Sequence, residues 1–364
     1  MAHRIEGLRQ RAASVTLQRL LASPYRTDAA SFRRNDVASP AGPNGRPWLR
    51  QGAVCAARSR RPIIRNGLRR GGMALLILLS LVAAARAGSV VTERFTSATL
   101  GREWAYNVYL PTGYETSRLS YPVLYLLHGA NQDEQEWVTQ GQVGRIADAM
   151  IATGRIPPCL IVMPYARGSW YLDRGERVET ALVEDLLTRI AARFRTIAAR
   201  EGRAIAGESM GGYGALRFVL KYPDRFAAAA LLSPAIYVPE PPLQSASRKA
   251  AVFQRAGAFD PTLWQNFNYP SLITTYAARN LSVPLFIAAG AEDELHIARH
   301  AATLFRLWRE HDWPASLHIL PGHHDFVLWR ELLPQALDFV FQRLSRPVLP
   351  AGDGPVPTQH MAGR

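Results

Sequence analysis

The sequence predicts an α/β fold built around a mainly parallel sheet, and three observations lead to this prediction. Short apolar runs such as Pro122–Leu127 and Leu160–Met163 lack polar alternation, which is typical of strands buried on both faces. Segments with helical spacing of apolar residues stand between these runs. Strands and helices then alternate over residues 88–344, as in sheets whose parallel strands are joined by crossover helices.

The elements follow in order along this region. Two alternating segments come first and predict antiparallel strands, Val90–Phe95 and Trp104–Leu110. Further strands are predicted over Pro122–Leu127, Leu160–Met163, Arg203–Ala206, Phe226–Leu232, Pro284–Ala289 and Ser316–Leu320. Helices are predicted over 142–153, Glu179–Thr196, 210–221, Leu295–Trp308 and Val327–Leu344. The Pro-, Ser- and aromatic-rich stretch 234–282 predicts an irregular insertion, and the Pro- and Gly-containing stretch 345–364 predicts a disordered tail.

The positive charge of the chain is confined to its N-terminal part. The 364 residues carry a formal net charge of +14, which alone would suggest a nucleic-acid partner. Residues 1–87 hold 16 Arg and 3 acids, whereas residues 88–364 hold 27 basic and 26 acidic residues. Residues 88–364 are therefore close to neutral, and we expect no nucleic-acid partner.

The leader divides into two parts. Residues 1–65 are rich in Arg, Ala, Ser, Pro and Gly and show no hydrophobic period, so we expect them to be disordered or absent from the mature protein. Residues 66–87 combine Arg69–Arg70, an apolar run from Met73 to Ala85 and the small-x-small end Ala85–Ala87, the layout of a secretory signal. We expect export to the periplasm or outside the cell and no stable membrane span. Membrane anchoring by an uncleaved signal is the alternative.

The two cysteines exclude some classes of site. Cys55 lies in the leader, and Cys159 begins an apolar run, which predicts a buried side chain. Two cysteines so placed cannot form a disulfide framework or a cysteine metal site. The sequence does not indicate an oligomeric state.

The motif Gly-x-Ser-x-Gly stands at Gly207–Gly211, with Ser209 at its centre, between a predicted strand and a predicted helix. This is the context of a nucleophile elbow, in which a sharp turn exposes the serine at the edge of the sheet. Glycines two residues before and after the serine remove side chains that would clash in such a turn. We therefore predict that Ser209 is a nucleophile.

A serine nucleophile needs a base and an acid that orients the base. The loop after strand Pro284–Ala289 offers an acid, and the loop after strand Ser316–Leu320 offers a histidine. Both loops lie at carboxyl ends of strands, on the edge of the sheet where Ser209 is expected. The residues leave alternatives open: Asp293, Glu292, Glu294 or Asp260 for the acid, and His324 or His323 for the base.

Two backbone N–H groups are expected to form an oxyanion hole. The first belongs to Met210, which follows the nucleophile at a helix N-terminus. The second is expected from Ala130, in the sequence His128-Gly129-Ala130 after a predicted strand. We expect His128 to position this loop. It precedes the serine in the chain and is not our candidate for the base.

Several motifs together resemble the esterase D-like (“Putative esterase”) family of α/β-hydrolases over residues 90–343. They are the His-Gly loop, Gly-Glu-Ser-Met-Gly-Gly-Tyr-Gly-Ala, Gly-x-x-Asp and Pro-Gly-His-His-Asp-Phe-x-x-Trp. The resemblance implies an α/β-hydrolase fold with Ser209 as nucleophile, Asp293 as acid and His324 as base. It also implies a substrate site formed by His128, Gly129, Trp170, Tyr171, Glu208 and Trp329. Glu208 occupies a position where many relatives carry an apolar residue.

The resemblance implies ester hydrolysis through an acyl-enzyme, with no metal or organic cofactor. Members of the family include feruloyl esterases, S-formylglutathione hydrolases and antigen 85 mycolyltransferases. We therefore expect a serine carboxylesterase that hydrolyses small or carbohydrate-linked acyl esters. The alternatives are an acyltransferase to a sugar hydroxyl, an S-formylglutathione-type thioesterase and a non-catalytic binding protein on the same fold.

Overall fold

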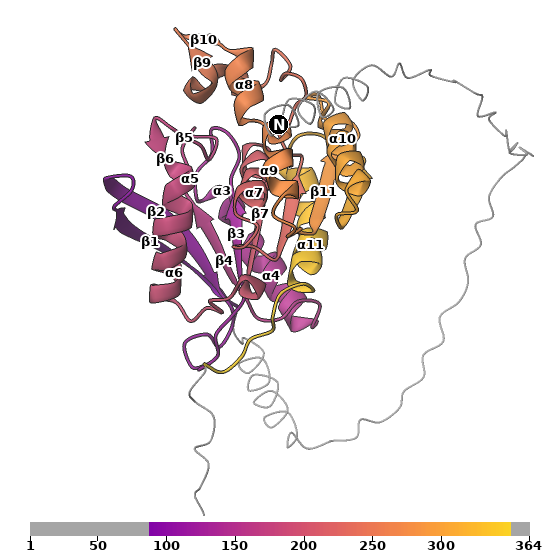
Figure 1. Cartoon of the computed structure of the whole chain (residues 1–364). Coiled ribbons are helices and arrows are strands. Elements are labelled where there is room, and N and C mark those ends of the chain that lie inside the picture. Colours follow the sequence, from indigo (N-terminus) through magenta and orange to yellow (C-terminus); the bar gives the residue numbers. More distant parts are fainter. Residues whose placement is uncertain (1–86, 351–364) are drawn as a thin grey trace, which may run out of the picture. The chain divides into compact units, whose positions relative to one another are not determined.

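A computed structural model describes residues 87–350. The expectations for the leader, for the signal-like segment up to residue 86 and for residues 351–364 therefore lie outside the described residues. The central sheet has eight strands in the order β1-β2-β4-β3-β7-β8-β11-β12 (Figure 1). The strands are β1 Ser89–Ser97, β2 Arg102–Leu110, β3 Val123–Leu127, β4 Leu160–Pro164, β7 Arg203–Glu208, β8 Ala228–Leu232, β11 Leu285–Gly290 and β12 Ala315–Leu320.

The strand directions confirm the predicted mixture of an antiparallel edge and a parallel centre. β1 and β2 pair antiparallel to each other, and β2 pairs antiparallel to β4. The rest of the sheet is parallel: each adjacent pair in the order β4-β3-β7-β8-β11-β12 is parallel. Every residue of β3, β4, β8 and β11 is buried, which explains their continuous apolar sequences.

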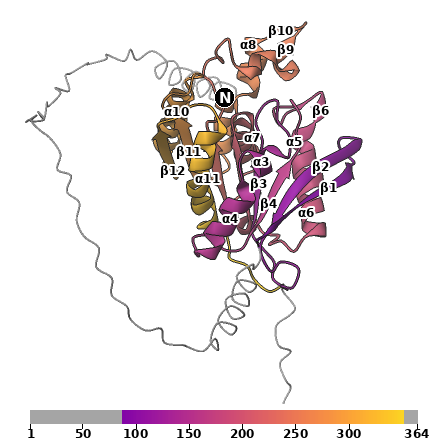
Figure 2. The same cartoon turned by 180° about the vertical axis from the view of Figure 1, so that it is seen from behind.

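Helices cover both faces of the sheet (Figures 1 and 2). One core contains buried residues of α5, α6, α7 and α10, and the other contains buried residues of α3, α4 and α11. Their bounds are α3 Glu136–Thr139, α4 Val143–Ala152, α5 Val178–Ala181, α6 Leu187–Arg193, α7 Met210–Lys221, α10 Ile297–Glu310 and α11 Phe326–Phe341. A π-helical turn, Leu182–Leu186, joins α5 to α6 within the segment predicted as one helix. Among residues 87–350, no helix is both long and apolar enough to cross a membrane.

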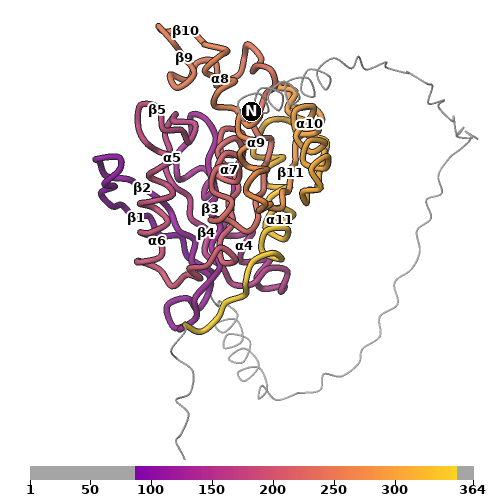
Figure 3. The backbone as a smooth tube through the Cα atoms, in the orientation of Figure 1, coloured from indigo at the N-terminus to yellow at the C-terminus, as the bar shows by residue number. Residues whose placement is uncertain are grey.

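The predicted irregular insertion contains only short elements, whose path Figure 3 shows. It holds the hairpin of β9 (Gln254–Arg255) and β10 (Ala258–Phe259), the helices α8 (Pro261–Phe267) and α9 (Ile273–Ala277), and 3-10 turns at Ala246–Lys249, Ala251–Phe253 and Tyr269–Leu272. A second small hairpin, β5 (Asp173–Arg174) with β6 (Glu176–Arg177), follows β4 and was not predicted. Both hairpins lie toward the same end of the sheet in Figure 1.

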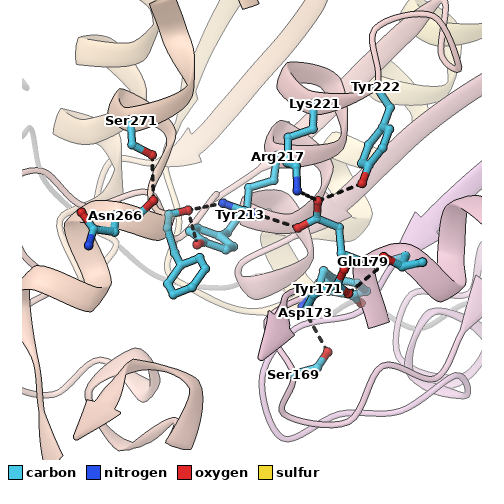
Figure 4. Close-up of polar contacts among 12 residues, drawn as sticks. Ser169, Tyr171, Asp173, Glu179, Tyr213, Arg217, Lys221, Tyr222, Asn266 and Ser271 are labelled. Carbon is cyan, nitrogen blue, oxygen red and sulfur yellow. Dashed lines mark hydrogen bonds and ion pairs between the residues drawn. The ribbon is translucent and has the colours of Figure 1, made fainter. Parts of the chain in front are cut away.

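A buried polar cluster anchors the insertion to α7 (Figure 4). The Arg217 guanidinium donates to Glu179 at 2.8 Å and also to the Phe267 carbonyl oxygen. Lys221 forms a second ion pair with Glu179. Tyr213, one turn before Arg217 on α7, donates its hydroxyl to the same Phe267 oxygen at 2.6 Å. The end of α8 is therefore tied to the helix that follows the Gly-x-Ser-x-Gly motif.

The stretch expected to begin a disordered tail makes specific backbone contacts at residues 345–350. Ser345 donates its N–H to the Glu201 oxygen at 2.8 Å. Val348 forms an antiparallel bridge with Ser120, with hydrogen bonds of 2.7 and 3.0 Å. These bonds satisfy backbone groups of the segments before β3 and β7, which is why residues 345–350 are ordered despite their composition.

Candidate active site

The register of the parallel strands brings the predicted site residues to one edge of the sheet. Leu127 lies beside Gly207, Glu208 beside Leu232, and Gly290 beside Leu320. The carboxyl ends of β3, β7, β8, β11 and β12 are thus level. The loops that follow carry Ala130, Ser209, Asp293 and His324.

Ser209 occupies the strained turn that the motif predicts. Its φ of 54° and ψ of −116° are a conformation that side-chain-bearing residues rarely adopt. The turn is held by the Ser209 N–H, which donates to the Leu232 oxygen at 2.9 Å, and by the Ala235 N–H, which donates to the Ser209 oxygen at 3.0 Å. A Cβ on Gly207 would lie 2.4 Å from the Gly211 carbonyl carbon, so this approach requires glycine.

The structure brings Ser209, His324 and Asp293 into one hydrogen-bonded chain. The His324 Nε2 atom lies 2.9 Å from the Ser209 Oγ atom, and the His324 Nδ1 atom lies 2.8 Å from an Asp293 carboxylate oxygen. A carboxylate only accepts hydrogen bonds, so Nδ1 carries the proton and Nε2 is free to accept the serine hydroxyl proton. The Asp293 side chain is fully buried and also accepts the Leu295 N–H, which fixes its orientation.

The other candidate acids and the other candidate base have different contacts. Glu292 accepts the Gly322 N–H and thereby ties the two loops together. Glu294 is exposed and lies 3.8 Å from the ring of His323, whose Nδ1 atom contacts the Glu292 backbone oxygen at 3.1 Å. Asp260 caps α8 within the insertion, where it accepts two backbone N–H groups. The arrangement therefore favours Asp293 and His324.

His128 holds the loop expected to carry the second oxyanion donor. Its Nε2 atom accepts the Ala166 N–H at 2.9 Å, so its Nδ1 atom is the donor to the Gly129 oxygen at 2.7 Å. Burial lowers the pKa of His128 to about 4, which keeps the ring neutral. Tyr171 donates its hydroxyl to the His128 backbone oxygen at 3.0 Å and so holds the same loop.

A cleft of about 570 Å³ opens over Ser209. Among the predicted substrate-site residues, Trp170 and Trp329 line it, as do Ala130 and His324. Glu208 borders the cleft but has no exposed surface, so it lies beneath the lining. His128, Gly129 and Tyr171, which were predicted to contact the substrate, do not line it; their polar groups bond to one another and hold the loop. Met210 is fully buried at the first position of α7.

Aromatic contacts hold the wall of this cleft. The Trp329 indole N–H donates to the Ser233 Oγ atom at 3.1 Å, and its ring meets the His324 ring edge-on at a centroid distance of 5.1 Å. On the other side, Trp170 has a left-handed backbone with φ 54° and packs edge-on against Tyr213 at 5.4 Å and Phe253 at 5.3 Å. The insertion thus shapes the cleft through packed rings.

The sequence reasoning missed several residues of the cleft. Tyr237 and Gln244 come from the insertion, where no motif marked them. Asn131 and Gln132 directly follow the His-Gly-Ala sequence, so their position was the available signal. The remaining unpredicted lining residues are Gln140, Ala235, Ser245, Ala246, Leu295, Asp325, Phe326, Val327 and Arg330. Within residues 87–350, no group of three His, Cys, Asp or Glu side chains could hold a metal ion.

The mixed sheet, the strained Ser209 and the Ser209–His324–Asp293 contacts define the chain as an α/β-hydrolase. A family model described as “Putative esterase” matches residues 97–340, and the chain belongs to that family.

Known relatives agree with this assignment. The chain is 33% identical over 232 residues to an endo-1,4-beta-xylanase/feruloyl esterase of Xylanibacter ruminicola, a match that covers 61% of this chain and 30% of that protein. It is 24% identical to an S-formylglutathione hydrolase of Arabidopsis thaliana, over 62% of this chain and 83% of that protein. A solved ferulic acid esterase superposes with a TM-score of 0.60 at 27% identity, over 72% of this chain and all of that one.

Proposed function

We propose that this esterase-family hydrolase is a serine carboxylesterase in which Ser209 is the nucleophile, His324 the base and Asp293 the acid that orients the base. The observation that carries the proposal is the hydrogen-bonded chain from Ser209 and His324, which line the cleft, to the buried Asp293. The N–H groups of Met210 and Ala130 are the proposed oxyanion hole.

The proposed reaction proceeds in two steps. The Ser209 Oγ atom attacks the ester carbonyl carbon while His324 Nε2 takes the hydroxyl proton, and negative charge develops on the carbonyl oxygen. The bond to the alcohol oxygen then breaks, His324 returns the proton to that oxygen, and the acyl group remains on Ser209. Water repeats the sequence, which releases the carboxylic acid and restores the serine.

The cleft supports a small or carbohydrate-linked acyl ester as the substrate. Its amide side chains, Asn131, Gln132, Gln140 and Gln244, can exchange hydrogen bonds with sugar hydroxyl groups. Its apolar side chains, Leu295, Phe326 and Val327, can cover an acyl group. The similarity to relatives named feruloyl esterase favours the same class. The signal-like segment before residue 88 supports export as part of this proposal.

Matched variants test the assignment. We expect Ser209→Ala and His324→Gln each to lower the kcat for p-nitrophenyl acetate by about 10⁴-fold or more. His323→Gln is the control because it removes the neighbouring exposed ring, and it should retain the wild-type rate. A fluorophosphonate probe should label the wild type but not Ser209→Ala. An unchanged rate in His324→Gln, or equal labelling of both proteins, would refute the assignment.

A thioesterase is the second candidate, because one relative is named S-formylglutathione hydrolase. Relative kcat/KM values for S-formylglutathione, acetyl, butyryl and feruloyl esters separate the two candidates. We expect the oxygen esters to be preferred. A preference for the thioester would transfer the proposal to the second candidate, and product analysis with an added acceptor sugar would reveal an acyltransferase.

A further inference from the structure

Glu208 stands directly before Ser209 at the end of β7, and its carboxyl group is sealed inside the protein. The residue has no exposed surface. Neither carboxyl oxygen has a hydrogen-bond partner, although both are buried. An ionised carboxylate is among the most costly groups to bury without a partner, so this environment favours the neutral acid.

The carboxyl group lies against the loop of the proposed oxyanion hole. A Cβ atom on Gly129 would lie 2.5 and 2.6 Å from the two Glu208 carboxyl oxygens, which shows how closely the group packs beneath Gly129. The Gly129 N–H donates to the Gln132 Oε1 atom at 2.9 Å. Ala130, the proposed oxyanion donor, is the next residue. One residue of backbone therefore separates the Glu208 carboxyl group from the position where negative charge develops.

The groups around Glu208 do not stabilise a negative charge there. Burial raises the pKa of Glu208 well above its ordinary value, and the Glu136 carboxylate of α3 acts in the same direction. The nearby Gly129 N–H acts in the opposite direction on this pKa, although its hydrogen bond goes to Gln132 Oε1 and not to Glu208. Tyr171 interacts electrostatically with Glu208, and burial raises the pKa of the Tyr171 hydroxyl, so that group stays neutral. The neighbouring His128 ring is neutral because burial lowers its pKa to about 4.

We propose that Glu208 is a positioning residue that works as an uncharged acid: it packs beneath Gly129 and keeps negative charge away from the oxyanion hole. The inference rests on the proposed function, because it requires an oxyanion at Ala130 and Met210. For a charge separation on the order of 10 Å and an effective dielectric constant near 20, ionisation of Glu208 would slow the reaction about tenfold or more. Glu208 thus sets the alkaline limit of turnover.

The pH profile of kcat tests this role. For the wild type we expect kcat for p-nitrophenyl acetate to fall about tenfold or more at alkaline pH as Glu208 ionises. Glu208→Gln is nearly isosteric and cannot ionise, so its kcat should stay level over the same pH range. Glu103→Gln, an exposed surface change, is the matched control and should keep the wild-type profile. Circular dichroism at each pH shows that the proteins remain folded.

Two further measurements keep the inference falsifiable. The infrared C=O stretch of a neutral buried carboxyl group should be present in the wild type at neutral pH and absent in Glu208→Gln. Glu136→Gln removes a nearby negative charge and should move the alkaline fall of kcat to lower pH, even if Glu208→Gln does not fold. An alkaline fall shared by Glu208→Gln, a missing infrared band or an unmoved profile in Glu136→Gln would each overturn the inference. Failure of the proposed function would appear differently, as fluorophosphonate labelling that Ser209→Ala does not abolish.

Discussion

Gly211 is the position where one added carbon atom should separate activity from stability most clearly. A Cβ on Gly211 would lie 2.3 Å from the Leu127 oxygen and 2.8 Å from the His128 oxygen, about 1 Å short of ordinary van der Waals contact. The Leu127 oxygen cannot easily give way, because it accepts the Trp137 indole N–H at 3.0 Å and belongs to a central strand. Gly211→Ala should therefore displace the loop that carries Ala130.

The magnitude follows from opposing effects. Overpacking against backbone costs about 1–3 kcal/mol, and the better helix propensity of Ala offsets about 1 kcal/mol of that loss. A displacement of about 1 Å in a catalytic group can cost about 100-fold in rate. With a net cost of about 1 kcal/mol, we expect a fall in Tm of about 2–4 °C but a fall in kcat/KM of about 100-fold.

Ester hydrolysis and thermal unfolding of the same preparations measure both effects. Gly168→Ala is the matched control, because its Cβ would meet no atom within 4 Å, and it should leave kcat/KM and Tm unchanged. A Gly211→Ala variant with the wild-type kcat/KM would show that the approach of α7 to β3 does not position the oxyanion hole.

Three other perturbations have expected outcomes. Arg217→Met removes the buried one of the two cationic partners of the Glu179 carboxylate and should cost about 3 kcal/mol in urea unfolding, most of which a second change, Glu179→Gln, should restore. Burial lowers the pKa of His300 to about 4 from 6.5, so the unfolded chain binds the proton first as the pH falls. The wild type should therefore lose about 3 kcal/mol of stability between these pH values, and His300→Gln should lose less. Trp329→Phe loses the hydrogen bond to Ser233 but keeps a ring beside His324, so unfolding should show a cost of about 1 kcal/mol while kcat changes little.

The central sheet was predictable because its strands are buried on both faces. Helix 210–221 and strand Leu160–Met163 were placed within one residue, since continuous apolar runs and glycine turns mark their ends. The π-helical turn Leu182–Leu186 was missed because the spacing of its apolar residues is also typical of an ordinary α-helix. The short hairpins were missed because two-residue strands carry no period.

The candidate nucleophile, acid and base could be predicted from the sequence, whereas many residues that line the cleft could not. Residue types and chain order gave the candidates, but the choice between His323 and His324 depends on which ring the loop turns inward, and spacing along the chain does not determine that. The positions of Tyr237 and Gln244 in the cleft follow from how the insertion packs. That packing depends on partners far apart in the sequence. For example, the Trp264 indole N–H donates to the Tyr237 backbone oxygen at 3.1 Å.

The predicted and the unpredicted residues belong to two different parts of the structure, the loops at the edge of the sheet and the insertion. Ser209, His324 and Asp293 stand in loops fixed by strand register, so their geometry changes little with the surroundings. The insertion supplies one wall of the cleft, and the Phe267 carbonyl oxygen, which accepts bonds from both Tyr213 and Arg217, is one of its anchors on α7. Substitutions that weaken this anchor should therefore change KM and substrate preference before they change kcat for a small ester such as p-nitrophenyl acetate. Equal losses of kcat for small and large esters would instead mean that the insertion also helps to position Ser209.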